Sequence, residues 1–183
     1  MSTTSTKFKT DKVRLSYAIN MYEAKANDKG EMKFGVTLLI AKTDTVTIER
    51  MKTAAEAVKR IKQPGKDDAF YKAWPRTIHD GDGTKPSTGE AYGPECKGCW
   101  VVAVSANEKP GILSLIPEFN SNTDKAHSGD FAKVSLTAFW FDTGTNKGVT
   151  FGLNNVLLLE RGERIDGRTS AADDFADEIG DAF

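Results

Sequence analysis

The segment from Phe131 to Phe141 alternates between two kinds of side chain in a pattern that suits contact with a nucleic acid. One face is plainly apolar and consists of Val134, Leu136, Ala138 and Trp140. The other face combines aromatic rings with a lysine and hydroxyl groups: Phe131, Lys133, Ser135, Thr137, Phe139 and Phe141. Aromatic rings stack on any base, at roughly 1–3 kcal/mol per base, while a lysine can meet a phosphate. The same pattern would also fit phenylalanines that form a second small core beneath a loop.

Basic residues accompany the predicted strands, and contacts from Lys and Arg to phosphates give salt-dependent affinity without reading a sequence. The candidate phosphate contacts are Arg14, Lys33, Lys97 and Lys133. Trp100 is a candidate base-stacking ring beside Phe139 and Phe141. Taken singly, each lysine or arginine also fits an ordinary solvated side chain.

The C-terminal residues 173–183 carry five acidic side chains and no basic one. Without these five, 21 Asp and Glu stand against 25 Lys and Arg, so the rest of the chain is net positive by about four. Carboxylates can imitate a phosphate backbone, and an apolar end can fit a pocket on a partner. A solubilising end, or a short amphipathic helix packed on the body, is the plainer interpretation.

The apolar residues of this tail are too few to fold alone, so we expect it to be disordered. The candidate partner-binding residues of the tail are Asp173, Asp174, Phe175, Asp177, Glu178, Asp181 and Phe183.

Asp80 and Asp82 lie in a His-Asp-Gly-Asp-Gly segment that looks at first like a metal or catalytic loop. It fails as a calcium loop, because Lys85 stands where glycine is needed and Ala91 where the bidentate glutamate is needed. A metal-dependent nuclease would need further carboxylates, for which Glu90 is the nearest candidate. Asp-Gly pairs are more simply explained as turn formers.

Cys96 and Cys99 have the spacing of a zinc knuckle. A structural zinc site needs four ligands, and only His79 and His127 remain to complete it, without ligand spacing between them. We therefore expect no metal, no cofactor and no catalytic residue.

Regular alternation predicts the strands that must position these residues. The predicted strands are Val13–Asn20, Met32–Ile40, Trp100–Ala106, Ile112–Ile116, Phe131–Phe141 and Gly148–Leu159. In the first two, the inward residues are expected to be Val13, Leu15, Tyr17, Ile19, Met32, Phe34, Val36, Leu38 and Ile40.

Apolar residues at spacings of three and four predict one main helix from Ile48 to Ile61, capped by Asp44 or Thr45 and ended by Pro64-Gly65. Residues 66–98 lack periodicity and are expected to form an elaborated loop over one face. The fold class is therefore mainly β: an OB-fold-like five-stranded barrel with one main helix and a long loop. We divide the chain into a flexible lead-in (1–11), a barrel domain (12–160), and a linker with the acidic tail (161–183).

No stretch approaches the ~20 apolar residues of a membrane span, and the polar N-terminus lacks the apolar core of a signal peptide. The two cysteines have no other partners. These features predict a reduced, cytoplasmic protein without a membrane partner.

Several longer blocks resemble a family of bacteriophage single-stranded DNA-binding proteins, also catalogued as a family of unknown function. The resemblance covers most of the chain and rests on the blocks 13–17, 78–82, 89–100, 146–148, 152–156 and 167–175. It implies an OB-fold that coats and protects single-stranded DNA in phage replication or recombination, in the cytoplasm of the infected bacterium.

The resemblance further implies that the tail competes with DNA for a basic groove and docks onto replication or recombination proteins. The last residues, Asp181-Ala182-Phe183, lack the proline often found before the final phenylalanine in bacterial versions. Two other classes stay open on the residues alone. One is a nuclease that uses Asp80, Asp82 and Glu90, and the other is an adaptor whose barrel binds no DNA. The oligomeric state is also open, a homodimer included.

Overall fold

The computed structural model describes residues 5–169 and 174–179. The strands are β1 (Lys7–Lys9), β2 (Val13–Ser16), β3 (Lys25–Ala26), β4 (Met32–Ala41), β5 (His79–Asp80), β6 (Cys99–Ala106), β7 (Gly111–Ser114), β8 (Phe131–Asp142) and β9 (Lys147–Glu160). The helices are α1 (Thr45–Lys62), α2 (Asp68–Lys72) and α4 (Ala176–Ile179), with short 3-10 helices η1 (Ala18–Met21) and η2 (Pro94–Cys96). Within the described ranges, no helix is both long and apolar enough to cross a membrane.

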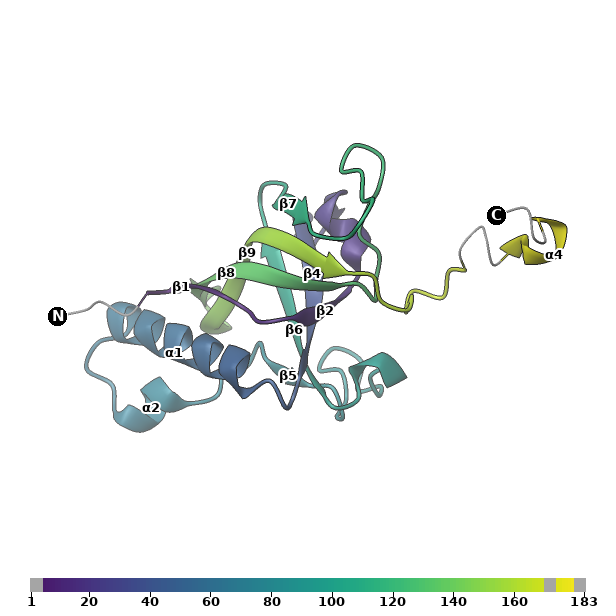
Figure 1. The fold of residues 1–183 in the computed structure, drawn as a ribbon. Coiled ribbons are helices and arrows are strands. Elements are labelled where there is room, and N and C mark those ends of the chain that lie inside the picture. The colour runs from purple at the N-terminus through teal and green to yellow at the C-terminus, as the bar shows by residue number, and fades with distance from the viewer. Residues whose placement is uncertain (1–4, 170–173, 180–183) are drawn as a thin grey trace.

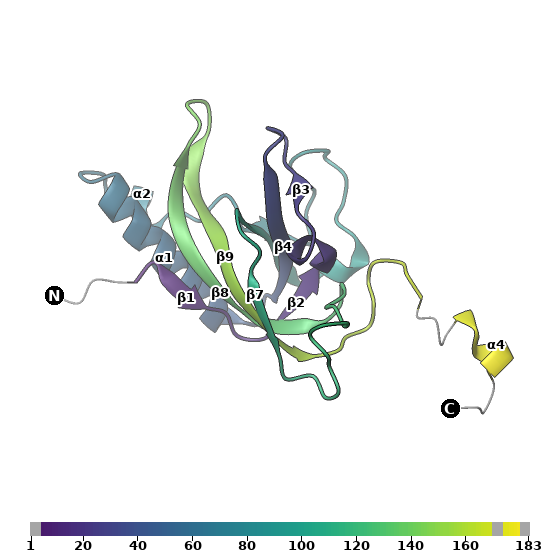
Figure 2. The same ribbon diagram turned by 90° about the horizontal axis from the view of Figure 1, so that it is seen from above.

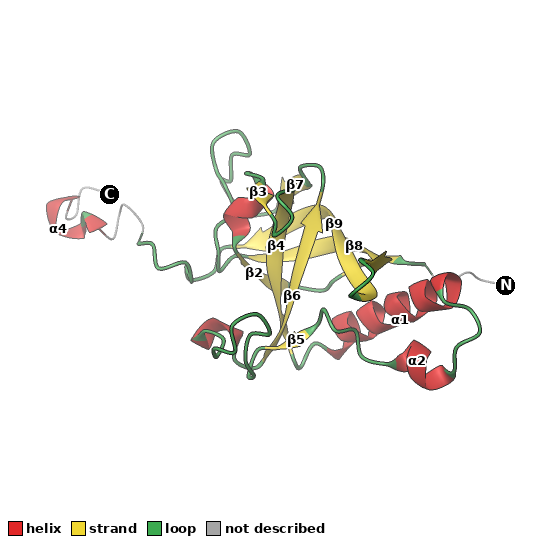
Figure 3. Cartoon of the chain, turned by 180° about the vertical axis from the view of Figure 1, so that it is seen from behind, coloured by secondary structure: helices red, strands yellow, loops and turns green. Residues whose placement is uncertain are grey.

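Five strands close into a barrel (Figure 1 and Figure 3). Antiparallel pairing joins β2 to both β4 and β8, β4 to β6, and β8 to β9. The ring is completed where β6 meets β9 in parallel, at Ser105 and Gly152. This order of strands is that of an OB-fold, with β2, β4, β6, β8 and β9 as its five strands. The main helix follows the second barrel strand, as the sequence predicts.

The inward face of the barrel strands forms the core with one face of α1. Leu15, Leu38, Leu136 and Phe151 are completely buried there. The helix packs on β1, β8 and β9 through its apolar side, on which Met51 is buried. Its first turn is capped by Asp44, whose carboxylate accepts a hydrogen bond from the Thr47 amide at 3.0 Å. The sequence therefore located the helix and most of its buried side correctly, and Asp44 is the cap of the two candidates. Ile61, expected on the apolar side, is exposed.

The strand predicted from Val13 to Asn20 is wrong in its second half. Strand β2 stops at Ser16, because Tyr17 adopts a left-handed conformation (φ 55°) and η1 follows. Tyr17 and Ile19 are consequently exposed rather than in the core. Met32, also predicted to point inward, is 60% exposed, because the first residues of β4 pair with the short strand β3.

A short strand replaces part of the predicted flexible lead-in. Residues 7–9 form β1, which pairs with β8 opposite Ser135–Thr137. Phe8 packs edge-on against the buried Phe151, with ring centroids 5.9 Å apart. An alternation of three residues is too short to be recognised in the sequence, and the strand depends on this contact with β9.

The long segment 66–98 is held to the barrel at both ends. The Lys59 ammonium of α1 donates to the carbonyl oxygens of Phe70 and Ala73, at 3.2 and 2.9 Å. Near the other end, Cys96 is buried with Leu39 and Val101 on the outer side of β4 and β6. The prediction that this segment covers one face of the barrel is confirmed.

Beyond β9, the chain crosses the loop that precedes β8 at very close range. The Ile165 amide donates to the Ser128 carbonyl at 3.1 Å. Gly129 has a φ of 112°, and a Cβ atom there would lie 1.9 Å from the Glu163 carbonyl oxygen. Only glycine allows both this backbone conformation and this approach.

Replacing Gly129 with alanine should lower the free energy of unfolding by about 3 kcal/mol or more, since the new methyl group must displace the 161–165 segment. Gly65→Ala is the matched control, because Gly65 also has a positive φ, but a Cβ atom there would have no neighbour within 4 Å. The control should cost only about 1 kcal/mol of left-handed strain. Urea unfolding measures both, and equal losses would contradict the close-approach argument.

Candidate nucleic-acid interface

Five small residues form an open patch on the outer side of the barrel. Gly35 and Thr37 of β4 pair with Ser105 and Ala103 of β6, and Ser105 pairs with Gly152 of β9. We call these five residues the floor. Ala103 and Ser105 are exposed, while Gly35, Thr37 and Gly152 are half-buried. The floor itself therefore presents only small side chains to a ligand. The face of the second and third strands is where OB-folds bind oligonucleotides.

Two hairpins rise on the same side of the barrel, one formed by β3 and β4 and the other by β8 and β9 (Figure 2). The β3–β4 arm consists of residues 25–33 and turns at Gly30, whose φ is 79°. The β8–β9 arm consists of residues 140–149, and its tip is closed by a hydrogen bond from the Thr143 amide to the Asn146 carbonyl, at 2.9 Å. These arms occupy the places of the two loops that complete the binding face of an OB-fold.

Two phenylalanine rings of β8 lie on glycines of the neighbouring strand β9. The Phe139 ring passes 3.1 Å from the position that a Cβ of Gly152 would take, and the Phe141 ring 3.4 Å from that of Gly148. An aromatic ring over a glycine of the next strand is a favourable cross-strand arrangement. Phe139 remains 46% exposed, so part of its ring is free beside the floor.

Cationic side chains are present on both arms. Lys33 borders the floor and donates a hydrogen bond to the Asn107 side chain, while Lys25 lies opposite it in β3. On the other arm, Lys147 shares a small groove with Arg76 and Phe141. Each arm therefore carries groups that can meet phosphates.

The structure separates the residues that the sequence grouped as DNA contacts. Phe139 lies on Gly152 of the floor, and Lys33 is two residues before Gly35 in β4. Phe141 lies on Gly148 in the β8–β9 arm, and the other four lie elsewhere or are engaged. Arg14 donates to the carbonyl oxygens of Gly129 and Glu163, at 3.2 and 2.8 Å. The Trp100 ring contacts Trp74 and the Lys42 ammonium, each at 4.8 Å.

Lys97 and Lys133 are exposed but lie away from the floor. Lys97 precedes β6, at the opposite end of that strand from Ser105. Lys133 lies on the same outer face of β8 as Phe139, six residues earlier, and lines a separate groove with Lys9 and Leu113.

The floor itself was missed in the sequence. Its signal was present, because Gly35 and Gly152 interrupt two strongly alternating strands. A glycine inside a strand often marks a place where a ligand or another backbone approaches closely.

The aspartates of the proposed nuclease loop are engaged with a lysine. The Lys42 ammonium lies 2.6 Å from Asp80 and 2.7 Å from Asp82. Its hydrogen bonds hold the pKa of both carboxyl groups below the usual range. Asp82 also accepts a hydrogen bond from the Gly98 amide at 3.0 Å, which joins this loop to the turn before β6.

The two cysteines are free thiols, Cys96 buried and Cys99 half-buried, and burial raises the pKa of each. Across residues 5–169 and 174–179, no group of three or more His, Cys, Asp or Glu side chains is arranged to hold a metal ion.

Part of the acidic tail falls within the described residues. Asp174, Phe175, Asp177 and Glu178 are exposed, next to the single turn of α4. The other predicted tail contacts, Asp173, Asp181 and Phe183, lie outside the described residues.

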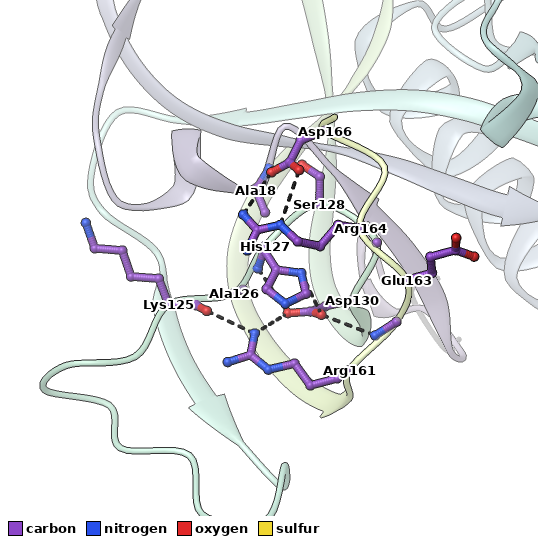
Figure 4. Close-up of polar contacts among 12 residues, drawn as sticks. Ala18, Lys125, Ala126, His127, Ser128, Asp130, Arg161, Glu163, Arg164 and Asp166 are labelled. Atoms are coloured by element: carbon purple, nitrogen blue, oxygen red, sulfur yellow. Dashed lines mark hydrogen bonds and ion pairs between the residues drawn. The ribbon is translucent and has the colours of Figure 1, made fainter. Parts of the chain in front are cut away.

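A buried carboxylate fixes the point from which the linker to this tail leaves the barrel (Figure 4). Asp130 is 0% exposed and accepts hydrogen bonds from Arg161 at 2.7 Å, the Gly162 amide at 3.2 Å and the His127 amide at 3.0 Å. Arg161 also donates to the Lys125 carbonyl at 3.0 Å. The His127 imidazole lies 3.1 Å from the same carboxylate.

A closed OB barrel with a floor of small residues and two arms that each carry lysine defines a nucleic-acid-binding domain of the OB class. Residues 6–182 match the family described as "Enterobacter phage Enc34, ssDNA-binding protein". The chain belongs to this family of phage single-stranded DNA-binding proteins.

Two solved structures of the bacteriophage Enc34 protein share the fold. The one in complex with single-stranded DNA has a TM-score of 0.69 at 23% identity, covering 87% of this chain and 89% of that chain. A C-terminal truncation of the same protein has a TM-score of 0.67 at 23% identity, covering 87% and 88%. No curated protein sequence matches the chain.

Lowering the pH through about 6.5, the usual pKa of histidine, should reduce the free energy of unfolding. Burial lowers the pKa of His127 in the folded state, and the Asp130 charge offsets only part of this effect. The unfolded chain therefore binds a proton that the folded chain does not, so stability is highest above this pH and falls below it.

Urea unfolding between pH 7.5 and 5.5 measures how steeply the free energy of unfolding falls with pH. His127→Gln should make this dependence on pH weaker. Some slope should remain, because burial also lowers the pKa of His79. An unchanged slope in His127→Gln would contradict the assignment to His127.

Proposed function

We propose that the protein binds single-stranded DNA without sequence preference across the floor and between the two arms. The observation that carries this proposal is the exposed Phe139 ring, held on Gly152 beside a floor of small residues. Family membership and the complex of the Enc34 relative with single-stranded DNA support it.

In this proposal, bases stack on Phe139 and on the edge of Phe141, which tolerates any sequence because every base has a π-face. Lys33 and Lys147 meet phosphates on opposite sides of the floor, and Lys25 and Arg76 add to the positive field. Arg14 and Trp100 act mainly through their contacts within the protein, Arg14 with Gly129 and Glu163 and Trp100 with Trp74. Lys97 and Lys133 contact the DNA strand only where it extends beyond the floor.

The biological role that fits this binding is coating and protecting single-stranded DNA in phage replication or recombination, in the cytoplasm of the infected bacterium. We assign the protein no catalytic role. The Lys42 ammonium is ion-paired with both Asp80 and Asp82, the aspartates on which a nuclease site would depend.

We assign the acidic tail two functions, competition with DNA for the basic arms and recruitment of replication or recombination proteins. The exposed carboxylates of Asp174, Asp177 and Glu178 support this assignment, as does the exposed ring of Phe175. A homodimer is compatible with both functions.

Phe139→Ala should weaken binding to oligo-dT by about 5–150-fold, the loss of one stacked base at roughly 1–3 kcal/mol. The dependence of affinity on salt should not change, because no charge is removed. Lys33→Met should instead reduce the slope of log K against log salt by about 0.7, the value for one phosphate contact on a single strand. Fluorescence titration at several salt concentrations measures both quantities.

Lys72→Met is the control, since Lys72 lies exposed on α2, outside the floor and the arms. It should leave both quantities unchanged. Labelled DNA incubated with Mg²⁺ in the same experiment should remain intact, and cleavage would favour the nuclease alternative. Wild-type protein that does not bind oligo-dT would overturn the proposed function.

Deleting residues 173–183 should tighten binding to oligo-dT several-fold at low salt and less at physiological salt, where screening is stronger. A full-length variant with Asn or Gln in place of the five acidic residues should behave like the deletion, because the competition depends on charge. The competition is refuted if both variants bind as the full-length protein does at low salt.

A further inference from the structure

Tyr17 combines two unusual properties. Its side chain is 62% exposed, and its backbone lies in the left-handed region, with φ 55° and ψ 38°. A bulky side chain rarely adopts this conformation unless its surroundings impose it, and such strain concentrates at ligand-binding sites.

The residues on both sides of Tyr17 fix this conformation. Leu15 is completely buried, and its amide and carbonyl are bonded to Asp130 and Gly129 at 2.8 Å each. Ala18 is also completely buried, and its amide donates to the Ser128 hydroxyl at 3.2 Å. With both neighbours anchored inside, the chain turns at Tyr17 and the side chain is directed to solvent.

Tyr17 is not used as a structural contact, in contrast to Tyr22 in the same segment. The Tyr22 hydroxyl accepts a hydrogen bond from the Ala126 amide at 2.8 Å, and two lysines lie 5.6 Å from its ring. Among the described residues, neither a hydrogen bond to the Tyr17 hydroxyl nor an aromatic or cationic partner for its ring is present.

Tyr17 directly follows the last residue of β2, the strand that borders the floor on the side of β4. Ser16, the preceding residue, pairs with Thr37, and Thr37 pairs with Ala103. At the opposite edge, beyond Gly152, lies Phe139. Three barrel strands, β4, β6 and β9, lie between β2 and β8 along this face, so four strand spacings of ~4.8 Å make about 19 Å around the surface. The direct pairing of β2 with β8 lies at the start of β2, at Val13 and Arg14.

We propose that Tyr17 is a base-stacking residue, the counterpart of Phe139 at the opposite edge of the floor. This inference rests on the proposed binding of single-stranded DNA and adds a second contact point for the strand. A DNA strand that crosses the floor would then meet one aromatic ring at each edge of the floor, with small residues between the two rings.

Tyr17→Gly is the most informative variant, because it separates stacking from folding. Glycine adopts the left-handed conformation without strain, so the melting temperature should stay the same or rise. Binding to oligo-dT should nevertheless weaken by about 5–150-fold, with an unchanged salt slope. Tyr17→Phe should bind like the wild type, and so should Ile19→Ala, the control at an exposed apolar residue of the same segment.

Photo-crosslinking of the wild-type protein supplies a test that needs no variant. An oligo-dT that contains 5-iodo-deoxyuridine should crosslink to Tyr17, as located by mass spectrometry, and unlabelled oligo-dT should suppress the product.

If Tyr17→Gly binds like the wild type and Tyr17 does not crosslink, while Phe139→Ala is weakened, the Tyr17 proposal is wrong and the proposed function stands. If the wild-type protein does not bind oligo-dT at all, both are wrong.

Discussion

Strand β2 is hydrogen-bonded on both of its edges, to β4 and to β8, and the rest of the structure depends on this double pairing. Together with the parallel contact of β6 with β9 at Ser105 and Gly152, it closes the sheet into a barrel. Closure leaves the outer surface as the place where a ligand can meet the strands. It also fixes the register that sets Gly35 beside Ser105 and Ser105 beside Gly152, from which the floor is built.

Anchored polar groups decide which parts of this outer surface stay open. Lys59 holds the start of the long segment 66–98, Lys42 joins the Asp80 loop to the turn before β6, and Asp130 holds the C-terminal linker. These anchors hold the segment 66–98 and the C-terminal linker against the barrel. A charged group that is removed from water is costly unless it is paired, and the buried carboxylate of Asp130 is paired with Arg161 and two backbone amides.

Local patterns in the sequence correctly predicted the elements whose formation depends on residues close to one another in the chain. Alternation located the barrel strands and the outward rings of Phe139 and Phe141, and spacing located α1 with its Asp44 cap. The failures lie where distant segments decide the outcome. Arg14 is engaged by Glu163, 149 residues away, and Trp100 by Trp74. Tyr17 leaves the core because Leu15 and Ala18 are both anchored to the loop before β8, which no local pattern reveals.

The contact between Phe139 and Gly152 also has an entropic consequence. A ring that rests on the backbone of the next strand has few rotamers left, and Gly152 provides the room for that position. Immobilising a side chain on binding typically costs about 0.5–1.5 kcal/mol. At Phe139 this cost is largely met during folding of the protein itself. A base that reaches the floor therefore encounters a preorganised surface, and more of its stacking energy is available as affinity.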